Sequence, residues 1–180
     1  YELYIKKDDA KEIYNLIINN GKKYHLSLCG MHAMDIMRME SGFLHWGHDI
    51  SPEENQYEAG LNFAISFKKN IDFVGKQALL KIKEKKQKKQ FLMLTLKESK
   101  PGEPLLLHDE PIYLDGKIIG RTTSGNYSFN FNKNLAFGYV KINEDINSLK
   151  KNLIEIEVEK NKYKAEILTN PLNQKDYKNS

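Results

Sequence analysis

Residues 111–121 read PIYLDGKIIGR, and this stretch decides how the C-terminal half of the chain folds. The residues on either side of Asp115-Gly116 form two short β-like runs. An Asp-Gly pair between such runs favours a tight hairpin, because both residues readily adopt the positive φ angles that the turn requires. We therefore predict two antiparallel strands, at 111–114 and 117–121.

Similar runs continue on both sides of this hairpin. They occupy residues 91–96, 134–141, 153–160 and 163–168, and Asn161 lies where a second hairpin would close. Six short strands at regular spacing are typical of a small antiparallel barrel or sandwich. We expect this all-β domain to cover residues 90–180.

The first 89 residues have a mixed pattern. Their apolar periodicity predicts helices at 10–21, 31–40 and 74–86 and strands at 1–5 and 61–67. Asp8 or Asp9 is expected to cap the first helix, and Gly21 to end it in a left-handed conformation. The prediction is an α+β fold, with an α+β region at 1–89 followed by a C-terminal antiparallel β-barrel at 90–180.

The composition is ordinary for a globular chain, with 40% hydrophobic and 29% charged residues. Its apolar runs are far shorter than the ~20 residues of a membrane-spanning helix, so we predict no membrane partner. Cys29 is the single cysteine, and no internal disulfide can form. We expect it to be a buried thiol in a protein of a reducing compartment, the cytoplasm.

The chain begins with YELYI rather than with Met or a signal peptide. This opening alternates like a strand from its first residue. We interpret the chain as a portion of a longer protein, whose upstream segment is then its partner.

The charge balance argues against a nucleic-acid partner. The chain has 28 basic and 24 acidic residues, a net charge of +4, and only Arg38 and Arg121 are arginines. Arginine is the residue that usually contacts phosphate and guanine. Six lysines gather within residues 81–89, but no aromatic residues alternate with them as a stacking surface would require. We interpret them as a solvated helix end.

Two polar stretches are candidates for a site. His45 and His48, followed by Asp49, do not have the spacing of a helix-borne zinc pair, and we predict a polar loop without metal. Residues 122–126 read TTSGN and predict a small polar turn.

Arg38 and Glu40 lie two residues apart, so they cannot face each other on one helix. We expect each of them to pair elsewhere, and a buried contact between Arg38 and a carboxylate is a reasonable outcome.

Three blocks of sequence occur in a recognisable order. They are AMDIMRMESG (33–42) with WGHD (46–49) and YEAGL (57–61), then DFVGKQAL (72–79), then IGRTTSG (119–125) with AFGYV (136–140). Together they resemble the C-terminal part of the aminomethyltransferase family, which includes the glycine cleavage T-protein and the folate-binding region of dimethylglycine and sarcosine dehydrogenases. The WGHD and GRTTSG sequences are more similar to the dehydrogenase branch.

The resemblance implies a partial folate-binding α+β region followed by a barrel, and transfer of a one-carbon unit to tetrahydrofolate. In the T-protein the unit arrives on a lipoyl carrier protein, which would then be a partner. In the dehydrogenases it comes from an imine made by a flavin, so FAD would belong to an upstream domain. The family's essential aspartate has no match here, and we assign no catalytic residue to this chain.

Two residues carry over as cofactor-binding candidates. Glu2 matches a family glutamate that accepts paired N–H bonds from the pterin, and Trp46 matches an aromatic residue that walls the ligand cavity. Met34 stands where the T-protein has an arginine that contacts folate. This departure favours the dehydrogenase-like branch, and it also keeps open a second reading, a non-catalytic folate-binding or assembly module.

Overall fold

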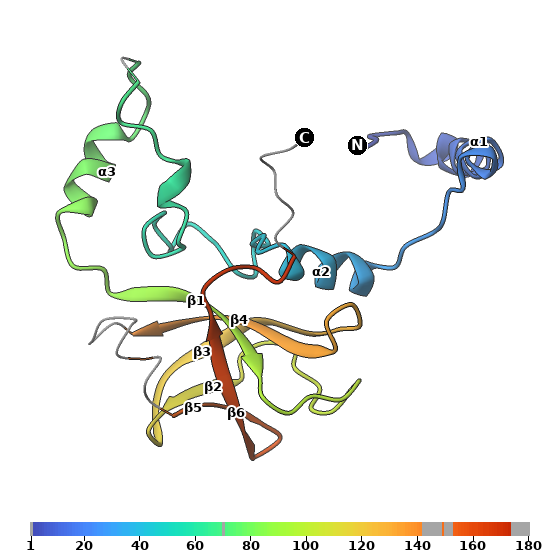
Figure 1. The fold of residues 1–180 in the computed structure, drawn as a ribbon. Coiled ribbons are helices and arrows are strands. Elements are labelled where there is room, and N and C mark those ends of the chain that lie inside the picture. The colour runs from blue at the N-terminus through green and yellow to red at the C-terminus, as the bar shows by residue number, and fades with distance from the viewer. Residues whose placement is uncertain (1, 70, 142–148, 150–152, 174–180) are drawn as a thin grey trace. The chain divides into compact units, whose positions relative to one another are not determined.

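The computed structural model describes residues 2–69, 71–141, 149 and 153–173 of the chain (Figure 1). The chain forms two compact units, Tyr1–Ala33 and Met34–Ser180. The predicted boundary at residue 89 stays a prediction.

The first unit contains the α-helix α1 between two 3-10 helices. The 3-10 helix η1 (Lys7–Asp9) leads into α1 (Ala10–Gly21), and a second 3-10 helix, η2 (Lys22–Tyr24), follows it. This confirms the first predicted helix, although Asp9 makes no capping hydrogen bond and Gly21 is right-handed, with φ −71°. The left-handed residue is His25, with φ 57°, because the 3-10 turn extends the helix to Tyr24 before the chain reverses.

The strand predicted at 1–5 is wrong for the residues that the structure describes. Residues 2–5 have no regular structure, and they pair with no strand of the described chain. An alternating sequence becomes a strand only when a neighbouring strand accepts its backbone hydrogen bonds.

The second unit begins with helices and loops. The helix α2 (Met31–Glu40) starts at the end of the first unit and agrees with the prediction for 31–40. The predicted strand at 61–67 is wrong: a 3-10 helix, η3 (Asn62–Ala64), occupies it, and Phe63 is 83% exposed. The alternation there finds no sheet to bury its apolar face. The helix α3 (Lys76–Lys83) is shorter than predicted, and it begins after the left-handed Gly75.

Six antiparallel strands then form a closed barrel in the order β1-β4-β3-β2-β5-β6. The strands are β1 (Lys89–Leu96), β2 (Pro111–Leu114), β3 (Lys117–Ser128), β4 (Lys133–Lys141), β5 (Ile154–Val158) and β6 (Asn161–Leu168). Asp115 and Gly116 turn between β2 and β3 with φ of 48° and 78°, as the hairpin prediction requires. Closure removes the exposed sheet edges of an open sheet.

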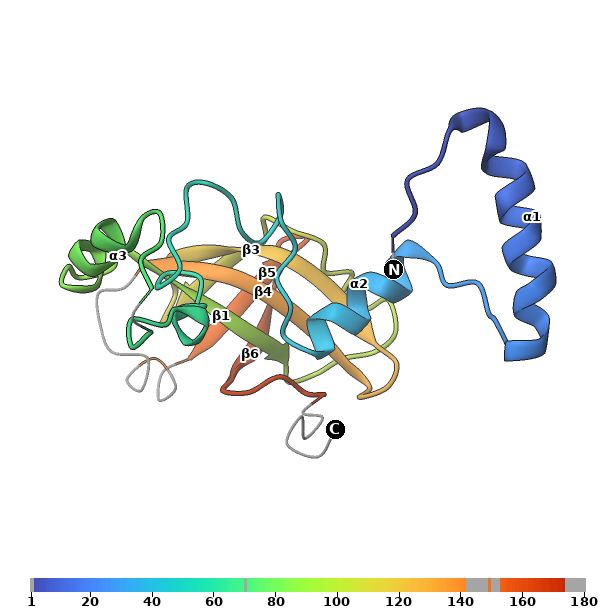
Figure 2. The ribbon, with the colours of Figure 1, turned by 90° about the horizontal axis from the view of Figure 1, so that it is seen from above.

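The barrel has an apolar interior and a partly covered outer face. Leu94, Ile112 and Ile156 are fully buried inside it. On the outer face, Ile36 and Met39 of α2 pack against Leu135 and Phe137 of β4, and Figure 2 shows α2 beside this sheet. The helix is therefore positioned by the barrel.

Residues 122–126 are not the predicted turn, because they lie within β3. A β-bulge interrupts the pairing of β3 with β4 between Thr122 and Ser124. At this bulge the hydroxyl groups of the consecutive residues Thr123 and Ser124 both contact Asp49 of the loop that follows α2. Within the described part of the chain, no helix is long and apolar enough to cross a bilayer.

Candidate functional site

Asp49 is the centre of a buried polar network between α2, the following loop and the barrel. Its side chain has no exposed surface and forms an ion pair with Arg38, whose side chain is 14% exposed. Arg38 also donates from Nε to Asp35 Oδ1 at 2.8 Å and from Nη1 to the Phe43 carbonyl at 3.1 Å. A buried carboxylate is tolerated because a cation and several donors satisfy it.

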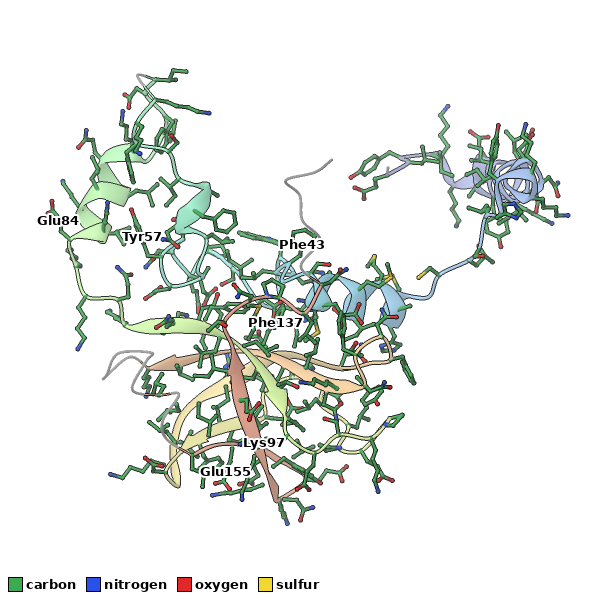
Figure 3. The ribbon with its side chains drawn as sticks, in the orientation of Figure 1. Phe43, Tyr57, Glu84, Lys97, Phe137 and Glu155 are labelled. Carbon is green, nitrogen blue, oxygen red and sulfur yellow. The ribbon has the colours of Figure 1, made fainter. Side chains whose placement is uncertain are left out.

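The barrel completes this network. Thr123 Oγ1 and Ser124 Oγ donate to Asp49 Oδ1 at 2.5 and 2.7 Å, and Arg38 Nη2 donates to Ser124 Oγ at 2.7 Å. The Arg38 guanidinium also lies 5.4 Å from the ring centre of Phe137, which is labelled in Figure 3 on the barrel face below α2. We call Arg38, Asp49, Thr123 and Ser124 the Arg38–Asp49 clamp.

The clamp fixes the loop that carries Trp46. The backbone N–H of His45 donates to Asp49 Oδ2 at 2.9 Å, and the N–H of Gly47 donates to the Ile50 carbonyl at 2.8 Å. Trp46 itself forms a parallel bridge with Ile50, yet its side chain is 66% exposed. The Trp46 ring is therefore exposed to solvent, while hydrogen bonds hold the backbone of its loop in place.

Glu40 belongs to a separate buried contact at the end of α2. It is 2% exposed, and its carboxylate accepts hydrogen bonds from Ser128 Oγ at 2.6 Å and from Asn130 Nδ2 at 2.9 Å. Arg38 and Glu40 thus pair elsewhere, as predicted, and Arg38 makes the expected buried contact with a carboxylate.

The two histidines do not gather a metal-binding set. The centres of the His45 and His48 rings lie 4.6 Å apart, and the Asp49 carboxylate forms its ion pair with Arg38 in the clamp. In residues 2–69, 71–141, 149 and 153–173, no three His, Cys, Asp or Glu side chains form a group that could hold a metal ion.

A second ion pair ties the loop to the start of β1. Glu54 accepts from Ser51 Oγ at 2.6 Å and from the Ser51 N–H at 2.8 Å, and it pairs with Lys89. Burial raises the pKa of Glu54, but the hydrogen bonds from Lys89 and Ser51 outweigh this effect and lower the pKa below its ordinary value.

The remaining candidate residues lie outside this network. Glu2 is exposed in the irregular segment before η1, and Met34 is 51% exposed on α2. Cys29 is exposed, so the prediction of a buried thiol is wrong; it lies in an irregular connection that offers no core to cover it.

The clamp is the feature that sequence reasoning missed. Asp49 belongs to the WGHD sequence and Ser124 to the GRTTSG sequence, and the two residues lie 75 positions apart. A single sequence gives no indication that these two short motifs are in contact. The sequence feature that could have located the clamp is Arg38, for which a buried carboxylate partner is predicted.

Family models match both parts of the chain. The GCVT N-terminal domain matches residues 1–69, and the glycine cleavage T-protein C-terminal barrel domain matches residues 89–173. The chain belongs to the aminomethyltransferase family. The strands β1 to β6 lie within the range that the barrel-domain model matches.

Two curated relatives show the range of this family. The chain is 35% identical to dimethylglycine dehydrogenase of Homo sapiens over 172 residues, which are 96% of this chain and 19% of that protein. It is 32% identical to the aminomethyltransferase of Bacillus subtilis over 171 residues, 95% of this chain and 45% of that enzyme. The chain thus spans less than half the length of these relatives.

A solved structure has the same fold. The glycine cleavage system aminomethyltransferase T from Bartonella henselae matches 88% of this chain and 43% of its own, with a TM-score of 0.75 and 22% sequence identity. This likeness agrees with the α+β fold and the closed barrel described above.

Proposed function

We propose that this chain forms the C-terminal part of a tetrahydrofolate-dependent one-carbon transferase, similar to the T-protein or to dimethylglycine dehydrogenase. Membership of the aminomethyltransferase family supports this proposal, because both family models match in order along one chain. Tetrahydrofolate would supply the amine that accepts the one-carbon unit. The protein's task is then to hold that amine near the donor carbon, which replaces a bimolecular encounter.

The observation that supports this proposal most directly is the exposure of Trp46 on a fixed loop. Its ring is exposed on a loop that the Arg38–Asp49 clamp fixes, so it can contact a planar ligand without first being ordered. Pre-organised aromatic side chains are effective at binding planar rings because little conformational entropy is lost. We assign to Trp46 one wall of the folate cavity.

Glu2 is the second proposed contact. Its carboxylate is exposed, and no hydrogen bond or ion pair of Glu2 is found within the described chain. Two parallel N–H bonds from a pterin would each contribute about 1.5–3 kcal/mol when they form away from water. The carboxylate of Glu2 thus has the chemistry that a pterin contact requires.

The rest of the site is proposed to come from an upstream segment of the same protein. Exposed apolar side chains support this, including Tyr14 and Leu16 of α1 and Met37 of α2, which are 51%, 61% and 56% exposed. Contiguous exposed apolar surface marks an interaction site, and we propose that an upstream segment covers these side chains. The proton-handling residue would lie in that segment, with FAD there too if the enzyme is a dehydrogenase, or a lipoyl carrier protein as partner if it is T-protein-like.

The test is a tetrahydrofolate titration of the protein that includes this chain and its upstream segment. Binding at 100 times the dissociation constant stabilises by about 2.7 kcal/mol, which raises the melting temperature. Trp46→Ala should weaken the binding, whereas Trp46→Phe should keep most of it. Phe63→Ala, at another exposed aromatic residue, is the matched control. The proposal fails if the ligand leaves the melting temperature unchanged.

A non-catalytic folate-binding or assembly module is the second candidate. Met34 favours it, because a thioether cannot form the ion pair that an arginine would form with the glutamate tail of folate. The same titration separates the two: binding without transfer of a one-carbon unit supports the second candidate. We also propose a cytoplasmic location, which fractionation of cells expressing the natural protein would test.

A further inference from the structure

A cavity of about 610 Å³ lies between the loop after Trp46 and the outer face of the barrel. Residues 47–54 form one wall, and β3 and β4 form the floor. Trp46 and Glu2 are not among the residues that line it. A volume of this size is within the range of small-molecule binding sites, about 300–1,000 Å³.

Strand register places three cations on the floor of this cavity. Lys89 of β1 is directly opposite Lys141 of β4, and Arg121 of β3 is directly opposite Tyr139 of β4. Residues directly opposite each other share a face, as do residues two apart on one strand, so all four side chains are on the same face. Like charges in such a pair repel each other. Glu54 offsets this repulsion at Lys89, so Lys141 is the cation at which an anion would add a counter-charge.

The carboxylates around the cavity neutralise two of these cations. Glu54 pairs with Lys89, and Asp109 Oδ1 accepts from Arg121 at 2.7 Å. Lys141 has no ion pair in the described chain, although it lines the cavity. Asp49 also lines the cavity, and it pairs with Arg38. Glu53, exposed at the loop wall, is the lining carboxylate that has no ion pair in the described chain, and it would compete with a bound anion.

Tyr139 adds a hydrogen-bond donor with no partner. The residue is 8% exposed, and its hydroxyl is one of two buried side-chain groups in the described chain that lack a hydrogen bond. Burial raises the pKa of this phenol, and the carboxylates of Glu54, Asp49 and Glu58 raise it further, so the hydroxyl stays protonated. Buried polar groups are nearly always paired, and an unpaired donor beside a cavity indicates a missing acceptor.

Part of the cavity lining is apolar. Pro111, Ile118 and Ile119 line the cavity, and Ile118 is 63% exposed. A ligand with an apolar body could therefore bury that body on this side while its charged end faces Lys141 and Tyr139.

We propose that this cavity binds a small organic anion, with its carboxylate or phosphate held by Lys141 and the Tyr139 hydroxyl and its apolar body against Pro111 and Ile118. The site is independent of the proposed folate contacts, since it shares neither Trp46 nor Glu2. Lys89 lies over the Tyr139 ring, with Nζ 5.1 Å from the ring centre, and it pairs with Glu54, so Lys141 supplies the charge for the anion.

The test uses benzoate and phenyl phosphate, which present a carboxylate and a phosphate on the same ring, and benzamide as the neutral control. Each is titrated into the 180-residue chain and followed by backbone amide NMR shifts. We expect saturable shifts at residues 47–54 and 118–121 with at least one anion, at least tenfold weaker binding of benzamide, and weaker anion binding at higher salt. The tighter anion identifies the head group. Equal binding of all three probes, or none, overturns the proposal.

Four variants sharpen this test. Lys141→Gln should weaken anion binding at least fivefold, and Glu53→Gln should strengthen it about twofold, because the two changes act on the cavity charge in opposite directions. Tyr139→Phe should weaken binding about tenfold without lowering the melting temperature, because its hydroxyl has no partner to lose in the chain itself. Lys133→Gln, on the same strand but outside the cavity, is the matched control. Unchanged affinity in both Lys141→Gln and Tyr139→Phe would refute the assignment.

Discussion

The barrel and the first unit use their apolar side chains in opposite ways. Leu94 and Ile156 of the barrel are completely buried, whereas Leu16 of α1 is 61% exposed and no described residue of the first unit is buried. The barrel therefore obtains its stability from contacts within this chain. The apolar side chains of α1 are not buried within their own unit. The same kind of substitution should therefore change the free energy of unfolding by different amounts in the two regions.

The two arginines show the same difference between regions of the second unit. Arg38 is 14% exposed and pairs with an Asp49 side chain that has no exposed surface. Arg121 is 72% exposed, and its partner Asp109 is 57% exposed. An exposed ion pair is screened by water and contributes little, whereas removal of one partner from a buried pair leaves an uncompensated charge.

The largest effect is expected from Asp49→Ala. The change leaves Arg38 buried without its counter-ion and also frees the loop that carries Trp46, so unfolding should become easier by about 3–5 kcal/mol. Urea unfolding followed by barrel circular dichroism measures this. Asp109→Ala is the matched control and should cost less than about 1 kcal/mol. Similar losses for both variants would contradict the distinction between the two pairs.

A leucine pair compares the barrel with α1. Leu94→Ala opens a cavity in a closed core and should cost about 2–5 kcal/mol, whereas Leu16→Ala should change stability by no more than about 0.5 kcal/mol in this chain. The urea midpoints of the two variants give the comparison directly. If Leu16→Ala matched Leu94→Ala, the helix would have to bury Leu16 against the rest of this chain.

The barrel could be predicted because its signals are local. Alternating runs and the Asp115-Gly116 turn specify strands and a hairpin from neighbouring residues alone, whereas six such strands are compatible with a sandwich as well as with the closed barrel that forms. The alternation at residues 61–67 is of the same kind, yet those residues form η3 rather than a strand. Alternation thus predicts a strand only where a sheet exists to receive it.

The site was harder to predict because its contacts are distant. The exposure of Cys29 and the meeting of Asp49 with Ser124 depend on which segments pack together, and no local pattern encodes this. Arg38 was the exception. Its spacing from Glu40 on one helix excluded their pairing and correctly predicted a partner elsewhere.

Ser124→Ala should have an intermediate effect within the clamp. Its hydroxyl accepts from Arg38 and donates to Asp49, so removing it costs about 1.5–3 kcal/mol, less than losing the ion pair itself. Trp46 is the single tryptophan of the chain, and its fluorescence reports on the loop separately. We expect a shifted emission maximum in Ser124→Ala and none in Ser128→Ala, whose hydroxyl binds Glu40 instead.

The smallest effect concerns the pH dependence of Glu54. Its folded-state pKa lies below the ordinary value, since the bonds from Lys89 and Ser51 outweigh burial, so the pair stabilises the fold while the carboxylate is ionised. This contribution is complete above the unfolded pKa of about 4.3 and is lost as the pH falls through the lowered folded pKa.

Glu54→Gln should therefore lower the free energy of unfolding by up to about 1 kcal/mol at pH 7. The difference in free energy of unfolding between this variant and the natural chain should shrink between pH 5 and pH 3.5. Glu53→Gln, at the exposed neighbour, is the matched control for the loss of one carboxylate from the same loop. A Glu54→Gln difference that stayed constant down to pH 3.5 would mean that the pair does not hold the loop to β1 through its charge.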